Sequence, residues 1–265
     1  MLLAAIAMLL NLTAIGETKI AADDPGVAVD LELVLAVDIS GSMDLEEAQI
    51  QRAGYVEALM HPEFLAAIRE GYHGRIAISY FEWGGTIGKN SWLPWSVIET
   101  DDDAVGFAQL IKKRPFASLR GTSLSTAIAY GSTLFDGNGY AGVRRVIDIS
   151  GDGPNNYGAP VTPARDAATA LGIVVNGLAI MVRPSAAYGP LDQYYADCVI
   201  GGPGAFVVSV QEPEDFATAI RRKLVLEVSG RQPPARLLPA ASGTDCMIGE
   251  KLRPGFDRYY PELNR

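Results

Sequence analysis

The sequence predicts a single α/β domain with a mostly parallel sheet, and three observations support this fold class. From Leu31 onward, apolar runs alternate with amphipathic stretches, which is the pattern of parallel strands connected by helices. The first run, Leu31 to Ile39, is almost continuously apolar, as expected for a central strand buried on both faces. The alternation continues to Val228 without an internal repeat. One domain therefore covers roughly residues 30–230.

The individual elements are predicted from local signals. One strand is expected to run antiparallel at the sheet edge, because Pro94 has no amide hydrogen and sheet edges tolerate proline best. The first helical stretch carries Gly54 and Pro62, where breaks are expected. A helix opened by Asp101-Asp102-Asp103 ends near Lys113, with acids at its start and bases at its end as the helix dipole prefers. Strands after the first are expected at 75–81, 92–98, 144–150, 173–181 and 205–210, and helices at 45–70, 101–113, 123–135, 163–171, 191–196 and 212–228.

The two ends of the chain differ from this domain. Leu2 to Ile15 is an apolar run too short for a comfortable membrane span, and it ends in the small-x-small pattern Ala14-Ile15-Gly16. These features predict a signal peptide within residues 1–22 and a periplasmic or secreted protein. A core helix and a retained membrane anchor are the alternatives. At the other end, residues 231–265 form a linker-like Arg231-Gln232-Pro233-Pro234 stretch and a tail without clear periodicity.

Charge and cysteine content limit the classes of partner. The chain has 22 Lys and Arg against 31 Asp and Glu, a net charge of −9, and no basic run. This composition argues against nucleic acid or an anionic membrane as a partner. Cys198 and Cys246 lack the spacing of a metal site. In an oxidising compartment they are a candidate disulfide, and two free thiols are the alternative.

A motif of three oxygen donors follows the first strand. It reads Asp38-Ile39-Ser40-Gly41-Ser42-Met43. Alternate positions place one carboxylate and two hydroxyls on the same side of the chain, and Gly41 lets the loop bend tightly. A small number of hard oxygen ligands suits Mg²⁺, which keeps several of its waters in protein sites. The motif therefore predicts a metal site where the first strand becomes a loop.

Two more oxygen donors are expected at the same edge of the sheet. Thr122 precedes a helix of small residues, and Asp152 follows the strand 144–150. In an open α/β sheet, ligands bind at the carboxyl ends of the strands where the strand order reverses. In the common order this point lies between the first and fourth strands, which here end at Asp38 and Asp152. The alternative assigns ordinary turn and helix-capping roles to all five donors.

Together these pieces resemble the metal-ion-dependent adhesion site of the von Willebrand factor A family, which reads Asp-x-Ser-x-Ser, then Thr, then Asp. The resemblance covers about residues 30–230 and implies a Rossmann-like fold with helices on both faces. It also implies a Mg²⁺ ion, or Mn²⁺ or Ca²⁺, that captures a carboxylate of a protein partner. The implied metal-binding residues are Asp38, Ser40, Ser42, Thr122 and Asp152.

Three further segments are similar to a bacterial family known only as domain of unknown function 1194, a resemblance that supplies no activity. Asn155 and Asn156 in these segments are candidates for the rim of the metal site, with turn formation as the alternative. Glu82 is a candidate outer-sphere carboxylate, with a solvated loop acid as the alternative. The segments are Phe81-Glu82-Trp83-Gly84, Ser150-Gly151-Asp152-Gly153-Pro154-Asn155-Asn156 and Gly201-Gly202-Pro203-Gly204-Ala205-Phe206.

The sequence contains no recognisable catalytic set. A serine hydrolase needs a histidine base, and the two histidines, His61 and His73, lie at a helix break and before the second strand. The glycine-rich run Gly201 to Gly204 leads into a strand, so it lacks the helix N-terminus that binds phosphate. We therefore expect a binding module that captures an acidic side chain of a protein partner through the metal. A metal-assisted hydrolase that uses the same ion is the alternative.

Overall fold

The computed structural model describes residues 26–43, 45–231 and 243–253. Six strands form one sheet in the order β3-β2-β1-β4-β5-β6. Every neighbouring pair is parallel except β2 and β3, which are antiparallel. The mostly parallel sheet with one antiparallel edge strand is therefore confirmed. The strands are β1 (Val27–Asp38), β2 (Ile76–Trp83), β3 (Leu93–Ile98), β4 (Tyr140–Gly151), β5 (Ile173–Ile180) and β6 (Val207–Val210).

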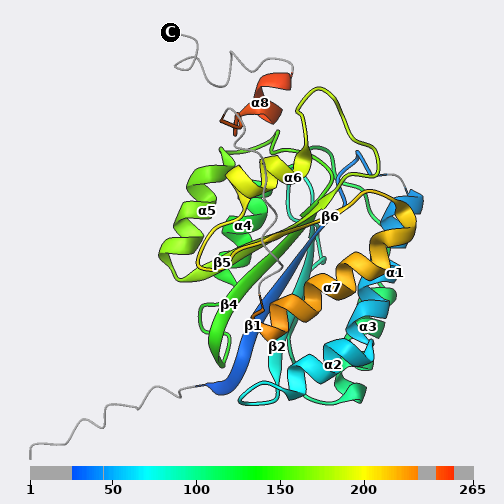
Figure 1. Ribbon diagram of the computed structural model, residues 1–265, viewed down its shortest axis with the longest axis vertical. Helices are drawn as coiled ribbons and strands as arrows, with labels where there is room; N and C mark the ends of the chain where they lie inside the picture. Colours follow the sequence, from blue (N-terminus) through cyan, green and yellow to red (C-terminus); the bar gives the residue numbers. More distant parts are fainter. Residues whose placement is uncertain (1–25, 44, 232–242, 254–265) are drawn as a thin grey trace, which may run out of the picture.

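Helices cover both faces of the sheet (Figure 1). One face carries α1 (Leu45–Leu59), α2 (Pro62–Arg69), α3 (Asp101–Lys112) and α7 (Phe216–Ser229), with a short 3₁₀ turn, Pro213–Asp215, before α7. The other face carries α4 (Leu124–Thr133), α5 (Val161–Ala170), α6 (Leu191–Tyr194) and the π-helical turn Tyr195–Val199. Each layer encloses its own buried apolar cluster against the sheet, as expected for a von Willebrand factor A-like fold.

The local signals act largely as predicted. Residues 31–40 are buried without interruption, which fits a central strand covered on both faces. Helix α3 begins with a capping box, in which Thr100 and Asp103 bond each other's backbone amides. Helix α7 ends at Gly230, whose positive φ of 63° closes the last turn. Strand β4 begins earlier than predicted, because Tyr140 and its neighbours pair with the start of β1.

The predicted breaks in the first helical stretch have different outcomes. Pro62 starts a new helix, α2, and the His61 side chain accepts a bond from the Glu63 amide. Gly54 does not break α1, so that prediction is wrong. A Cβ at position 54 would lie only 2.8 Å from Cδ1 of Ile220 in α7. Glycine at this position therefore allows α1 and α7 to pack closely.

The tail beyond α7, which has no clear periodicity in the sequence, contains one described helix. A short helix, α8 (Ile248–Leu252), lies at the upper end of the molecule (Figure 1). The predicted signal peptide lies outside the described residues. Within the described ranges, no helix combines the length and apolar character needed to cross a bilayer.

The sheet order brings the two predicted site strands together. β1 pairs with β4 along ten residue positions, and both end at the upper edge of the sheet (Figure 1). The chain leaves β1 for α1 on one face and leaves β4 for α5 on the other. The loops after Asp38 and Gly151 thus diverge from adjacent strand ends, which is the crevice where open α/β sheets bind ligands.

Candidate metal centre

Four of the five predicted metal-binding residues form a continuous chain of polar contacts. Asp38, the last residue of β1, is completely buried, and its Oδ1 accepts a bond from the Ser40 amide at 2.6 Å. The hydroxyls of Ser40 and Ser42 lie 2.9 Å apart. The Ser42 hydroxyl in turn donates to Oδ1 of Asp152 at 2.7 Å. The chain connects the end of β1 with the loop after β4.

Thr122, the fifth residue, is placed beside these by its backbone. Two residues upstream of Gly121, the Leu119 amide donates to the Ile39 carbonyl at 2.9 Å, which attaches this loop to the loop after β1. The Thr122 amide donates to Oδ1 of Asn156, and the Asn156 amide donates back to the Thr122 carbonyl, both at 2.9 Å. Thr122 therefore lies between the loops that carry the other four donors.

Burial and neighbouring carboxylates disfavour the charged forms of the two carboxyl groups of the site. Burial raises the pKa of Asp38 well above its ordinary value, and the neighbouring carboxylate of Asp152 raises it further. Bonds from Ser40 offset this only in part. Burial also raises the pKa of Asp152, against the lowering effect of its bond from Ser42. A dication between the two carboxylates would stabilise their charged forms.

One buried oxygen of the site has no hydrogen-bond partner in the described part of the chain. It is Oδ2 of Asp38, and buried polar atoms of this kind are rare in native proteins unless a water or ion satisfies them. No three His, Cys, Asp or Glu side chains of the described residues come together as a metal cluster. The available ligands are two carboxylates and several hydroxyls, a hard oxygen set that fits a Mg²⁺ ion retaining waters.

The two asparagines after Asp152 support the loops. Asn155 is completely buried, and its amide group donates to Oε1 of Glu250 at 2.6 Å and to the Ala159 carbonyl at 2.9 Å. Its Oδ1 accepts a bond from the Ser125 amide in the first turn of α4. Asn156 holds the Thr122 backbone, as described above. Asn155 is thus a buried residue that links three segments, while Asn156 contacts one of the predicted donors.

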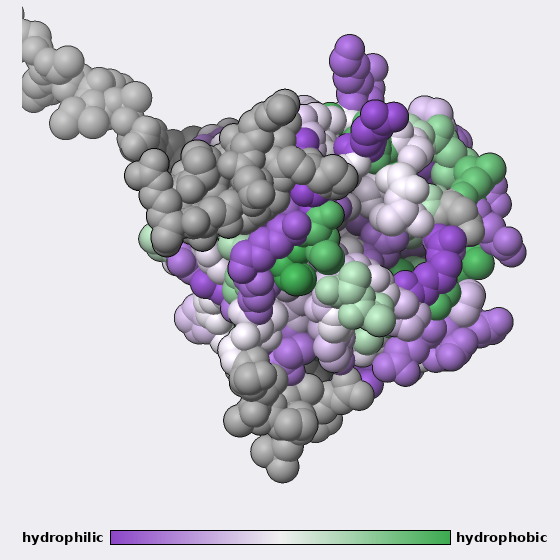
Figure 2. Space-filling model, turned by 90° about the horizontal axis from the view of Figure 1, so that it is seen from above, coloured by the Kyte–Doolittle hydropathy of each residue, from purple (hydrophilic) through white to green (hydrophobic). Residues whose placement is uncertain are grey.

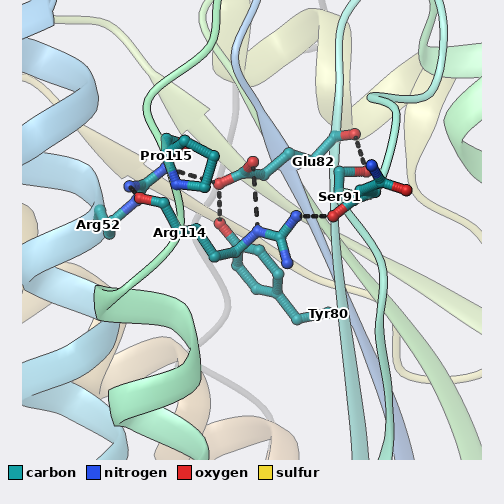
Figure 3. A network of polar contacts seen from close by, with 7 residues as sticks. Arg52, Tyr80, Glu82, Ser91, Arg114 and Pro115 are labelled. Carbon is teal, nitrogen blue, oxygen red and sulfur yellow. Dashed lines mark hydrogen bonds and ion pairs between the residues drawn. The ribbon is translucent and has the colours of Figure 1, made fainter.

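Glu82 lies in a buried ion-pair network (Figure 3). Glu82 is not a solvated loop acid, because it lies within β2 and only 3% of the residue is exposed. Its Oε1 accepts bonds from Arg52 of α1 at 2.8 Å and from the Tyr80 hydroxyl at 2.9 Å. Its Oε2 lies 3.6 Å from Nε of Arg114. Glu82 precedes the last residue of β2 and points to the α1 face, where these arginines reach it.

This network fixes the loop between α3 and α4. Arg52 also donates to the Arg114 carbonyl at 2.7 Å, and its guanidinium lies 3.8 Å from the ring centre of Phe116 (Figure 3 shows the polar contacts). The same loop continues to Leu119, which bonds the backbone next to Ser40. Glu82 therefore helps, through Arg52, to hold the loop that reaches the backbone beside Ser40.

The two cysteines join the distant C-terminal segment to the upper end of the domain. Cys198 and Cys246 form a disulfide, with their Cα atoms 5.5 Å apart. The Tyr194 hydroxyl donates to the Cys246 carbonyl at 3.4 Å, and the Arg253 guanidinium lies 4.8 Å from the ring centre of Tyr157. Residues 243–253 thus pack beside the loop that follows Asp152. Except for the cysteine pair, the sequence held no signal for this arrangement.

Sequence reasoning also missed two aromatic residues beside Asp38. Trp83 ends β2, Tyr195 begins the π-helical turn, and both are completely buried. No motif marks Tyr195, although π-helical turns are frequent at functional sites. The two histidines lie elsewhere: His61 caps α2 and bonds Arg221, and His73 follows α2.

Seen from above, the end of the molecule that carries this site is a mosaic of hydrophilic residues and smaller hydrophobic areas (Figure 2). Its loops expose the aromatic rings of Phe116 (44%) and Tyr157 (42%). Mixed polar and aromatic surfaces of this kind are common in protein interfaces.

Comparison with known protein families gives one match. The family described as "Protein of unknown function (DUF1194)" matches residues 28–232, which includes all five predicted metal-binding residues and, except for Val27 at the start of β1, all six strands. A comparison with curated protein sequences gives no match.

Several solved structures share the fold. Proximal thread matrix protein 1 of the mussel byssus matches with 16% identity and a TM-score of 0.54, over 77% of this chain and 49% of that one. The same protein "with zinc occupied MIDAS motif" matches with 15% identity and a TM-score of 0.51, over 77% and 49%. The pilus adhesin SpaC of Lactobacillus rhamnosus GG matches with 14% identity and a TM-score of 0.54, over 76% and 30%. This chain therefore spans half or less of the length of these proteins.

Proposed function

The chain belongs to the DUF1194 family, and from its site we propose that it is an exported, Mg²⁺-dependent binding module. Asp38, Ser40, Ser42, Thr122 and Asp152 would hold the ion, directly or through water. The ion would capture a protein partner through one of the partner's acidic side chains. The export part of the proposal is supported by the apolar N-terminal run with its small-x-small end.

The observation that carries this proposal is the buried Oδ2 of Asp38, which has no hydrogen-bond partner among the described residues and lies beside a second carboxylate of raised pKa. An ion would satisfy this oxygen and remove the repulsion between Asp38 and Asp152 at neutral pH. The contacts of the Ser42 hydroxyl with Ser40 and with Asp152 support the proposal, because they bring the hydroxyls and the second carboxylate together. The zinc-occupied adhesion-site motif of the mussel protein, which shares the fold, supports a divalent ion in this position.

The ligand set favours binding of an external carboxylate. A Mg²⁺ held by one or two carboxylates and several hydroxyls keeps more positive character than one in an all-carboxylate cage. It also keeps exchangeable waters, one of which an Asp or Glu of a partner can replace. The exposed rings of Phe116 and Tyr157 would then contact the partner around the ion. The net charge of −9 does not oppose this contact, because salt screens longer-range repulsion.

The metal itself is tested by Asp38→Ala. The wild-type protein is expected to bind one Mn²⁺ or Mg²⁺ per chain in calorimetry, and the variant is expected to lose this binding. The apo variant should be at least as stable as the apo wild type, because it lacks a buried carboxyl group whose charge is unfavourable. Asp136→Ala is the matched control, since Asp136 is exposed and precedes the amino end of β4. Equal metal binding by the Asp38 variant would contradict the site.

Capture of a partner is tested by removing the ion and, separately, Asp152. A pull-down from the cell envelope should recover a protein in Mg²⁺ and lose it in chelator and with Asp152→Ala. In the recovered complex, the residue that contacts the ion should be Asp or Glu. A partner that binds equally well in chelator, or that contacts the site through a basic residue, would show that recognition does not use the ion.

A further inference from the structure

Three buried polar atoms without hydrogen-bond partners among the described residues lie in one part of the molecule. They are Oδ2 of Asp38, the hydroxyl of Tyr195 and Nε1 of Trp83. They come from three elements, β1, the π-helical turn and β2. Each such atom is costly alone, and two of them, Oδ2 of Asp38 and the hydroxyl of Tyr195, lie close to the same point beside Gly151.

Gly151 shows how close Asp38 and Tyr195 are. A Cβ added to this last residue of β4 would lie 2.6 Å from the Tyr195 hydroxyl and 2.9 Å from Oδ2 of Asp38. The same point is 3.5 Å from Cη2 of Trp83. Any side chain at position 151 would therefore collide with both oxygens. The missing side chain leaves a small polar space between the Tyr195 hydroxyl and the Asp38 carboxylate.

The Tyr195 hydroxyl can act only as a donor toward this carboxylate. The ordinary pKa of a tyrosine phenol is about 10. The hydroxyl therefore keeps its proton at neutral pH. Asp38, in its charged form, has about four acceptor positions, of which the structure shows the Ser40 amide filling one on Oδ1.

We propose that Tyr195 is a positioning residue of the metal site, whose hydroxyl donates to Oδ2 of Asp38 directly or through one buried water. A water in this space would have polar partners on two or more sides, as buried waters require. The bond orients the Asp38 carboxylate, as hydrogen bonds from neighbouring groups orient the ligands of other metal sites. The proposal rests on the proposed function, because it assigns Tyr195 to that same ion.

Tyr195→Phe tests this role, because it keeps the buried ring and removes only the hydroxyl. We expect the affinity for Mn²⁺, measured by calorimetry, to fall by roughly 10–100-fold. The zero-field splitting in the EPR spectrum of bound Mn²⁺ should also change, since the carboxylate is no longer held in one orientation. The unfolding temperature of the apo variant should stay close to that of the wild type, because the buried ring and its packing are kept.

Tyr55→Phe is the matched control. The Tyr55 hydroxyl is also buried and without a hydrogen-bond partner among the described residues, but it lies in α1 on the opposite face of the sheet. Its loss should leave Mn²⁺ affinity and the EPR spectrum unchanged. Wild-type affinity in Tyr195→Phe, or a fall in affinity accompanied by a fall in apo stability, would overturn the positioning role alone. A wild-type protein that binds no Mn²⁺ would overturn the metal site as well.

Discussion

Lys223→Met is expected to lower the free energy of unfolding by about 3–5 kcal/mol at pH 7.5, the usual result of removing one partner from a buried ion pair. The Lys223 side chain is 1% exposed, and its Nζ lies 2.9 Å from Oδ1 of Asp148 and 2.6 Å from Oε1 of Glu227. The variant keeps two buried carboxylates and removes the cation between them. Its effect should therefore exceed that of an ordinary large-to-small change in the core.

The surroundings of this ion cluster make it sensitive to the loss of Lys223. Asn176 of β5 donates to Oε2 of Glu227 at 2.7 Å, so Glu227 is held in place from two sides. The ring centre of Phe206 lies 5.0 Å from the Lys223 ammonium. The cluster thus joins β4, β5 and α7 at a position that water does not reach. Water therefore cannot easily enter to solvate the two carboxylates when the Lys223 ammonium is removed.

The raised pKa of Asp148 determines how the effect of Lys223→Met on stability changes with pH. Burial raises the pKa of Asp148 to about 6, although Lys223 lowers it. Between the ordinary value of 3.8 and this value, the folded state binds more protons than the unfolded state. The contribution of Asp148 to stability is therefore complete below pH 3.8 and is lost as the pH rises through about 6. Without Lys223, the pKa of Asp148 should rise further.

The loss of unfolding free energy caused by Lys223→Met should consequently be smaller at pH 5 than at pH 7.5, because at pH 5 Asp148 is largely neutral in the folded variant. Urea unfolding of wild type and variant at the two pH values measures this difference. Arg222→Met is the control, since Arg222 is exposed on the same helix and should change stability by at most about 0.5 kcal/mol. A deficit that is the same at both pH values would mean that Asp148 does not titrate as proposed.

The parts of the fold that were predicted from the sequence depend on local patterns. The continuous apolar run of β1 indicates burial on both faces, and Pro94 indicates an edge, whatever the rest of the chain does. The positions of Asp38 and Asp152 follow from the rule that parallel strands end at one edge. These features can be predicted without knowing which side chains contact one another in the folded protein.

The parts of the structure that were not predicted depend on contacts between side chains that are far apart in the sequence. The burial of Glu82 follows from Arg52, which lies thirty residues earlier on a helix that covers the same strand. Gly54 resembles a helix breaker until α7 is packed against it. Tyr195 is one of several aromatic residues in an apolar region, and only the sheet order brings its hydroxyl to Asp38. A single sequence carries no local signal for contacts of this kind.

The packing of residues 243–253 against the domain is the largest contact that had no local signal in the sequence. Cys246→Ser tests how much the disulfide that holds this segment contributes to stability. The disulfide closes a chain segment whose ends are 48 residues apart. By the chain-entropy argument, a loop of this length stabilises the folded state by about 4 kcal/mol. We therefore expect the variant to unfold at lower urea concentration, with a loss of about that size.

Reduction provides the matched comparison. Reductant should lower the stability of the wild type to that of Cys246→Ser and leave the variant unchanged, because the variant has no bridge to break. The Glu250–Asn155 bond and the packing of Gly249 against the Asn155 carbonyl would hold the freed segment only weakly, since its covalent attachment close to them is gone. Intact mass after alkylation under denaturing conditions checks the bridge itself. Two alkylated cysteines in the non-reduced exported protein would show that the segment is held by these non-covalent contacts alone.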